Sequence, residues 1–195
     1  MGLTIGQLRQ RYSFKLLHDS DRIQAFSDRV ARVLNEGYAM GDGFPIPVVL
    51  LGVLDGCLPL LNDIIRKTND IDYQVATVKA TSYSKNKKKG MKLHFNVRSM
   101  NEFKNKFVII VDDIYDTGET FKAIGKKLKP YAKYIGWCSL LYKENSKTKF
   151  PERLGQDCLR VPEKAWVVGY GLDYDGYFRN LDGIYVMEKK SRTKE

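Results

Sequence analysis

Two short apolar runs, Val48–Val53 and Phe107–Val111, limit the folds open to this chain more than any other feature. Both are rich in β-branched residues and contain no polar residue, which is typical of a strand buried on both faces. Each is followed by acidic residues and glycine, and then by apolar residues at helical spacing, in Leu58–Ile65 and from Phe121 to Leu128. Strands that alternate with helices predict an α/β fold, in which a mainly parallel twisted sheet is flanked by helices.

Other segments add further elements to this plan. Apolar residues three and four apart predict an amphipathic helix over Asp21–Tyr38, with Ser20 as its N-cap. The segment Ser82–Gly90 is charged and has no periodicity, so a mobile loop is predicted there. Four more strands are predicted, at Val75–Ala80, Lys92–Val97, Tyr134–Leu141 and Trp166–Tyr170.

The chain of 195 residues is expected to form a single domain over residues 1–195. Its core is expected to span roughly residues 45–188, with the N-terminal helical segment and the basic tail from Lys189 to Glu195 as peripheral parts.

A formal net charge of +10 favours an anionic partner, which could be a phosphorylated metabolite, a nucleic acid or an acidic membrane. The sequence contains no apolar run of membrane-spanning length and no signal-peptide core, so no membrane partner is expected. Its three cysteines, Cys57, Cys138 and Cys158, are widely spaced and do not form a metal-binding pattern. They are expected to be inert thiols in the reducing cytoplasm.

The segment Val111–Thr120 carries the clearest chemical signal. A buried strand leads into Asp112 and Asp113, and a turn from Asp116 to Thr120 then opens a helix. Backbone N–H groups of such a turn, together with the helix dipole, hold a phosphate. The two acids accept hydrogen bonds from hydroxyl groups and attract Mg²⁺, so the pair of sites describes a ribose phosphate. The simpler alternative is a capped helix beside a solvated acidic loop, but the complete string directly after a buried strand favours the binding site.

The same ten residues resemble the signature of type I phosphoribosyltransferases that binds 5-phosphoribosyl-1-pyrophosphate (PRPP), and residues of roughly 45–188 resemble the hypoxanthine-guanine branch. The resemblance implies a small hood built from terminal segments, Mg²⁺ as cofactor, PRPP and a 6-oxopurine base as substrates, and a homodimer or homotetramer. It implies that Asp116 is the general base near N7 of the purine. It places the PRPP phosphate and ribose on Asp112, Asp113, Thr117, Gly118, Glu119 and Thr120.

Further segments match that branch in order. Leu54-Asp55-Gly56 resembles the pyrophosphate loop, in which a backbone N–H next to an often cis peptide contacts pyrophosphate. Many members have Lys where this chain has Asp55, so a backbone role is expected there. Arg179 matches a pyrophosphate-contacting arginine, and Ser82 and Tyr83 match the start of the flexible catalytic loop. The resemblance assigns the purine to Lys143, Trp166, Val167, Leu172 and Asp173, and the metal to Asp173, Asp112 and Asp113.

Taken singly, these residues have ordinary explanations. Lys143 could be a solvated lysine at a strand end, Trp166 a core residue, Asp173 a turn acid and Arg179 a surface cation. Their joint appearance favours the functional interpretation. The lysines of the predicted loop, by contrast, are interpreted as solvated.

The sequence therefore predicts a purine-salvage enzyme that transfers the phosphoribosyl group of PRPP to N9 of hypoxanthine, guanine or xanthine, among which it does not choose. Lys143 as a donor to an oxygen on C6 disfavours adenine. The alternatives are a regulator on the same fold that binds RNA or nucleotides, which the complete catalytic set makes unlikely, and a phosphoribosyltransferase for orotate, uracil or adenine. Nucleic acid is accordingly not expected as the main partner.

Overall fold

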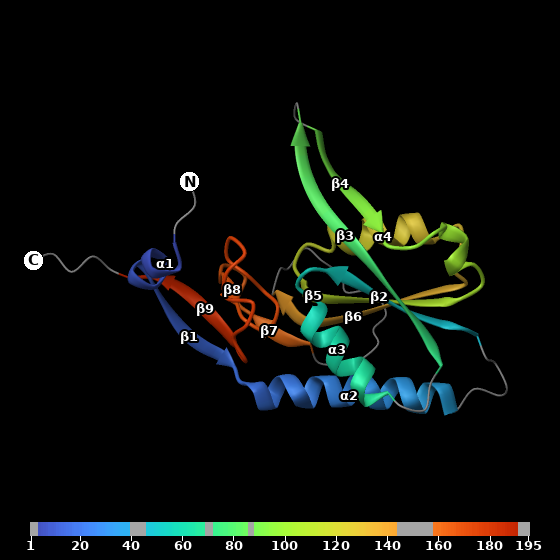
Figure 1. Cartoon of the computed structure of the whole chain (residues 1–195), viewed down its shortest axis with the longest axis horizontal. Coiled ribbons are helices and arrows are strands. Elements are labelled where there is room, and N and C mark those ends of the chain that lie inside the picture. The colour runs from blue at the N-terminus through green and yellow to red at the C-terminus, as the bar shows by residue number, and fades with distance from the viewer. Residues whose placement is uncertain (1–3, 40–45, 69–71, 86–87, 144–157, 191–195) are drawn as a thin grey trace, which may run out of the picture.

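A six-stranded sheet forms the main body of the protein in the computed structural model, which describes residues 4–39, 46–68, 72–85, 88–143 and 158–190 (Figure 1). Its strands lie in the order β4-β3-β2-β5-β6-β7, and only β4 runs antiparallel to its neighbour. The strands are β2 (Val48–Leu54), β3 (Tyr73–Lys85), β4 (Lys88–Phe95), β5 (Phe107–Tyr115), β6 (Tyr134–Lys143) and β7 (Leu159–Val161). The α/β fold with a mainly parallel sheet is therefore confirmed.

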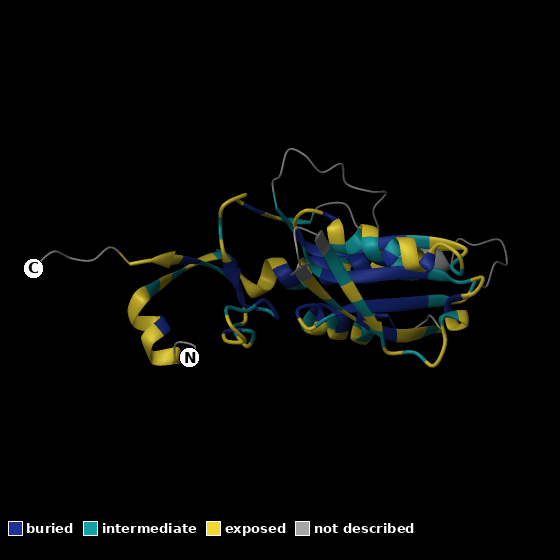
Figure 2. Ribbon diagram, turned by 90° about the horizontal axis from the view of Figure 1, so that it is seen from above, coloured by how far each residue is buried: buried dark blue, intermediate teal, exposed yellow. Residues whose placement is uncertain are grey.

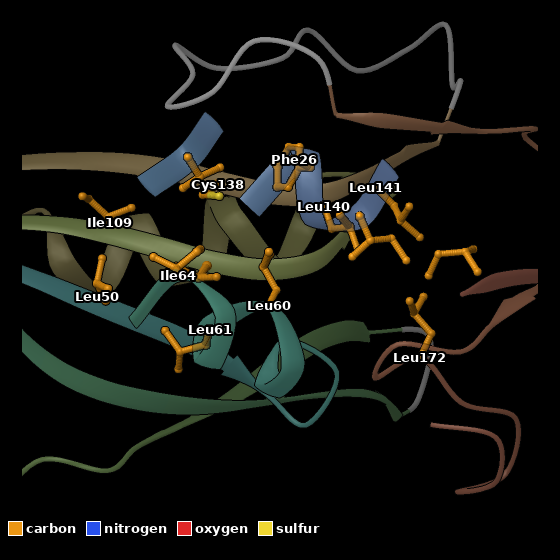
Figure 3. Packing of buried hydrophobic residues seen from close by; sticks show 14 of the residues in the cluster. Phe26, Leu50, Leu60, Leu61, Ile64, Ile109, Cys138, Leu140, Leu141 and Leu172 are labelled. Atoms are coloured by element: carbon orange, nitrogen blue, oxygen red, sulfur yellow. The ribbon is translucent and has the colours of Figure 1, made fainter. Parts of the chain in front are cut away.

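Helices cover both faces of this sheet. Helices α2 (Ser20–Ala39) and α3 (Leu58–Lys67) pack on one face, where Phe26, Leu60 and Ile64 meet strand residues such as Ile109 (Figure 3). Helix α4 (Glu119–Leu128) and the short 3-10 helix η1 (Met100–Phe103) cover the other face. Alternate residues of β2 and β5 pack against the helices on opposite faces of the sheet. Because both faces are buried, the runs Val48–Val53 and Phe107–Val111 contain no polar residue.

A second, three-stranded antiparallel sheet forms a hood beside the main sheet (Figures 1 and 2). Its order is β1-β9-β8, so strands from the two ends of the chain pair with each other. Phe14 and Phe178 pack beneath it with ring centroids 4.9 Å apart. The hood consists of α1 (Ile5–Arg11), β1 (Tyr12–His18), β8 (Val167–Val168) and β9 (Ile184–Lys189).

The structure differs from the sequence prediction at several places. Asp19 rather than Ser20 accepts a hydrogen bond from the first turn of α2, through the backbone N–H of Arg22. Helix α2 is a major part of the core rather than peripheral, since its inward residues are buried. The strand predicted over Trp166–Tyr170 is reduced to β8, because Gly169 and Tyr170 have positive φ values and turn the chain. Strands β1, β7 and β9 and helix α1 were not predicted.

The largest difference concerns the predicted loop at Ser82–Gly90. Instead of an irregular loop, β3 and β4 continue as a hairpin whose paired register runs from Val78↔Phe95 to Lys85↔Lys88. Figure 1 shows this hairpin extending beyond the rest of the sheet. Two exposed strands can pair through their backbones whatever charges they carry, so a lysine-rich composition does not exclude a strand.

None of the described helices is long and apolar enough to cross a membrane. Within the same residues, Cys57 and Cys138 are buried thiols without a disulfide. Burial is the main cause that raises the pKa of both thiols, and an unreactive thiol follows from it.

Candidate active site

A cleft of about 390 Å³ opens at the carboxyl ends of the central strands. Such strand ends are where ligands bind in open α/β sheets. The cleft is lined by the β2–α3 turn, the end of β5, the first turn of α4, one stretch of β3 and the loop before β9. It contains these residues proposed from the sequence: Asp55, Gly56, Asp112, Asp113, Asp116, Thr117, Gly118, Thr120, Asp173 and Arg179.

The turn before α4 has the geometry of a phosphate site. Gly118 is the residue at the helix N-cap and has φ 73°, a conformation that favours glycine. A side chain at this position would also collide with the hydroxyl of Tyr115, which lies beneath the turn. The backbone N–H of Glu119 donates to Thr117 Oγ1 at 3.4 Å, whereas within the described residues Asp116 makes no hydrogen bond to the helix. Asp116 is therefore not the helix cap, and the first-turn N–H groups beyond Glu119 are left without a side-chain cap and can bind a phosphate.

The two adjacent acids at the end of β5 differ in their surroundings. Asp112 is buried, and its Oδ1 accepts a hydrogen bond from the backbone N–H of Asp113 at 3.0 Å. Asp113 Oδ1 accepts from the backbone N–H of Ile114 at 2.7 Å. Burial raises the pKa of both carboxyls, and the negative charge of Asp113 raises the pKa of Asp112 further. Burial and mutual repulsion disfavour the charged forms of both carboxyls, and a bound cation or a ligand with hydroxyl groups would stabilise those charged forms.

The Leu54–Gly56 loop, predicted to bind pyrophosphate, is fixed by close backbone contacts. The peptide bond between Leu54 and Asp55 is cis. The Asp113 carboxylate lies directly against Gly56, and the backbone of Gly171 lies against the Gly56 carbonyl. Gly56 thus joins three segments that are far apart in the sequence, and a larger residue would separate them.

Three cation–carboxylate pairs lie in or beside the cleft. They are Lys143 Nζ and Asp116 Oδ2 at 3.5 Å, Arg179 Nη2 and Asp173 Oδ1 at 2.7 Å, and Lys79 Nζ and Asp55 Oδ2 at 3.7 Å. The two residues proposed for the purine end, Lys143 and Asp116, are therefore neighbours. Each of these three basic groups is paired with a carboxylate of the protein. An anionic substrate that binds one of them must therefore replace that carboxylate.

The Arg179 pair is the most constrained of the three. Arg179 Nη1 also donates to the carbonyl of Gly171 at 2.5 Å, and the backbone N–H of Gly171 donates to the Arg179 carbonyl at 3.0 Å. Asp173 Oδ2 accepts from the backbone N–H of Gly176 at 2.7 Å. Both side chains are consequently held in place before a substrate binds.

The carboxylates of the cleft fit a magnesium ion that binds together with its substrate. Among the described residues, no set of three or more acidic, histidine or cysteine side chains is placed to hold a metal alone. The predicted ligands Asp112, Asp113 and Asp173 line one cleft without forming a closed cage. Mg²⁺ usually keeps several waters and binds through one or two carboxylates plus substrate phosphates, so such an open set is suitable for it.

Several proposed residues do not line the cleft. Lys143 is one of them, and it reaches the site only through its pair with Asp116. Glu119 and Ser82 are exposed, and the side chain of Tyr83 is outside the described part of the structure. Val167 and Leu172 are buried in the core cluster instead. Trp166 is 56% exposed and packs edge-to-face on Tyr174, with ring centroids 5.8 Å apart. A large exposed indole at this position is available to stack on a flat base.

Some residues that line the cleft were not found by sequence reasoning. Lys79 lies opposite Leu54 in the β2–β3 register, which no local pattern in the sequence reveals. Trp137 stands behind the phosphate turn, with its ring 4.9 Å from Phe121 and 5.8 Å from Tyr115. Tyr115, within the acidic motif, could have indicated an aromatic wall of the cleft. No pattern in the sequence links it to its partner Trp137 on β6.

Several known proteins are similar to this chain. The model of the phosphoribosyl transferase domain family matches residues 21–175. The hypoxanthine-guanine phosphoribosyltransferase of Aquifex aeolicus is 32% identical over 183 residues, which cover 89% of this chain and 94% of that protein. The enzyme of the same name from Mycoplasma genitalium is 32% identical over 142 residues, covering 72% and 79%. The crystal structure of a hypoxanthine phosphoribosyltransferase from Staphylococcus aureus superposes with a TM-score of 0.74 at 25% identity, covering 89% and 91%.

Proposed function

The chain belongs to the phosphoribosyltransferase family, and on that premise we propose that it transfers the phosphoribosyl group of PRPP to N9 of a 6-oxopurine, releasing pyrophosphate. One observation carries the choice of substrate. The proposed phosphate turn at Asp116–Thr120 lines the cleft, and the Asp116 carboxylate lies 3.5 Å from the ammonium of Lys143 at the end of β6. A purine that displaces this ion pair meets a proton acceptor at N7 and a donor at its 6-oxygen.

The proposed reaction breaks the bond between the anomeric carbon and pyrophosphate and forms a bond from that carbon to N9. Backbone N–H groups of the turn before α4 hold the 5′-phosphate. Asp113 and the more deeply buried Asp112 accept hydrogen bonds from the ribose hydroxyls. Asp116 accepts or shares the purine proton as the bond to N9 forms. Arg179 and the backbone of Gly56 stabilise the charge of the leaving pyrophosphate.

Mg²⁺ is the proposed cofactor, with Asp173, Asp112 and Asp113 as the residues that face it. When bound, it neutralises charge on the pyrophosphate oxygens. Asp173 is held in place by Arg179 and Gly176, and Asp112 and Asp113 line the same cleft at the end of β5.

Both the main sheet and the hood contribute residues to the proposed active site. Asp173 and Arg179 come from the loop between two hood strands, yet they line the same cleft as residues of the main sheet. We therefore propose a single domain, active as a homodimer or homotetramer, in a compartment that keeps its thiols reduced. The alternative regulator that binds RNA or nucleotides is not favoured, since the named relatives are enzymes.

A PRPP-dependent assay with Mg²⁺ against hypoxanthine, guanine, xanthine, adenine and uracil tests the proposal. Because Lys143 is a donor, hypoxanthine or guanine should exceed adenine in kcat/KM by at least about tenfold, or about 1.4 kcal/mol. Lys143→Gln should reduce this preference while the protein stays folded. Equal or better use of adenine by the unmodified enzyme would contradict the proposed substrate.

A further inference from the structure

The pyrophosphate loop carries a negative charge where the proposed substrate brings several more. Asp55 lines the cleft, and 47% of its side chain is exposed. The Asp113 carboxylate lies against the neighbouring Gly56. The loop proposed to receive pyrophosphate is therefore flanked by two acids, which repel an anion unless a cation is close.

Lys79 is the cation nearest to this loop. It lies opposite Leu54 in the parallel pairing of β2 with β3, so its backbone is fixed one residue from Asp55. Its Nζ is 3.7 Å from Asp55 Oδ2, and 59% of its side chain is exposed. An exposed ion pair of this length is weak, so the ammonium can move to a more highly charged partner at little cost.

The other basic side chains in or beside the cleft are less free to move. Arg179 is held by Asp173 at 2.7 Å and by the Gly171 carbonyl, and Lys143 is paired with Asp116, which we assign to the base end. Among the described cleft residues, Lys79 is thus the basic side chain best able to change partner at the pyrophosphate end.

We propose that Lys79 binds the pyrophosphate end of the substrate, and that Asp55 is the carboxylate that pairs with its ammonium beside the Gly56 loop until pyrophosphate replaces it. The proposal rests on the proposed function and deepens it. Strand β3 thus adds a second positive charge to that of Arg179 at the pyrophosphate end, beside a β2–α3 turn that has the acid Asp55.

Direct binding measurements separate this role from catalysis. Calorimetry with Mg²⁺ and pyrophosphate, and separately with ribose 5-phosphate, is carried out on the unmodified enzyme and on Lys79→Met. Loss of a charge-assisted contact should weaken pyrophosphate binding by at least about tenfold and leave ribose 5-phosphate within about twofold. Lys126→Met, in the exposed last turn of α4 away from the cleft, is the charge-matched control and should leave both affinities within about twofold.

Two more variants test the pairing with Asp55. Asp55→Asn removes a competitor for the ammonium, so pyrophosphate should bind as tightly as before or about threefold more tightly. The double variant Asp55→Lys with Lys79→Asp places the cation on the loop, and should bind pyrophosphate within about threefold of the unmodified enzyme.

Unchanged pyrophosphate binding in Lys79→Met would overturn the proposal, and so would equal losses for pyrophosphate and ribose 5-phosphate, which would indicate a damaged cleft. A tenfold loss in Asp55→Asn would also overturn it, since Asp55 would then contact the metal or the ligand itself. If Lys79→Met weakens pyrophosphate binding alone, as expected, but the unmodified protein turns over no purine, the proposed function is rejected and the role of Lys79 in pyrophosphate binding is kept.

Discussion

The carboxylate of Asp113 lies directly against the backbone of Gly56, although 57 positions separate the two residues in the sequence. The contact joins the end of β5 to the loop after β2, and Gly171 adds the loop before β9 on the other side of the same glycine. The proposed ribose, pyrophosphate and metal sites therefore meet at one backbone position that has no room for a side chain.

Gly56→Ala should damage this junction. The added methyl group would overlap the Asp113 carboxylate, so the loop or the strand end must move. We expect a loss of about 1–3 kcal/mol in the free energy of unfolding and a fall in kcat/KM of at least about 10²-fold. Steady-state kinetics and denaturant unfolding measure the two effects.

Gly125→Ala is the matched control, because a methyl group at that helical position meets nothing within 4 Å. It should leave activity unchanged and stabilise α4 by about 0.5–1 kcal/mol. Equal behaviour of the two variants would show that the Gly56 contact is unimportant.

Asp173→Asn should impair use of Mg²⁺ and PRPP more than it impairs folding. The amide still accepts from the Gly176 N–H but no longer neutralises Arg179, and it is a poorer metal ligand. We expect the KM for PRPP to rise by at least about tenfold and the Mg²⁺ requirement to shift upward. Asp175→Asn, in the exposed part of the same turn, serves as the control. Full activity of the unmodified enzyme in excess chelator would exclude the metal role.

The main sheet and its helices could be predicted from the sequence because each has a local period. Phe107–Val111 is apolar throughout since both of its faces are covered, and α2 has a regular stripe that includes Phe26. The hood could not be predicted in this way. Its strand β1 alternates poorly, with Leu16 exposed, and it pairs with β9 from the other end of the chain.

The candidate site shows the same division. Asp112 to Thr120 form one continuous segment, so their common location could be predicted from a single motif. Lys79 could not, because its place beside Asp55 depends on the register of two strands. The hairpin at Ser82 could not be predicted from composition, because its strands pair through backbone groups that the charged side chains do not reveal.

The β3–β4 hairpin should respond to substrates if it closes over the reacting groups. It projects from the sheet edge in Figure 1, and exposed backbone hydrogen bonds open readily. Hydrogen exchange in residues 82–90 should slow by at least about fivefold when PRPP and a non-reactive purine analogue are both bound. Unchanged exchange would reject closure, and slower exchange with RNA alone would favour the nucleic-acid alternative.

Asp116→Asn is the most direct test of the proposed chemistry. The substitution keeps the size of the side chain but removes the proton acceptor for the purine and the charge that holds Lys143 at 3.5 Å. We expect kcat to fall by about 10²-fold or more, a usual contribution of a general base. PRPP affinity should change much less, because the 5′-phosphate is assigned to backbone N–H groups of the following turn.

Stability separates this role from a structural one. About half of the Asp116 side chain is exposed, and within the described residues it makes no hydrogen bond to the first turn of α4. Its replacement should therefore lower the free energy of unfolding by less than about 0.5 kcal/mol. Unfolding curves of Asp116→Asn and the unmodified protein should therefore coincide. A large loss of PRPP binding with little change in kcat would instead assign Asp116 to the phosphate turn. Only a slow, folded enzyme that still binds PRPP agrees with a base that acts on the purine.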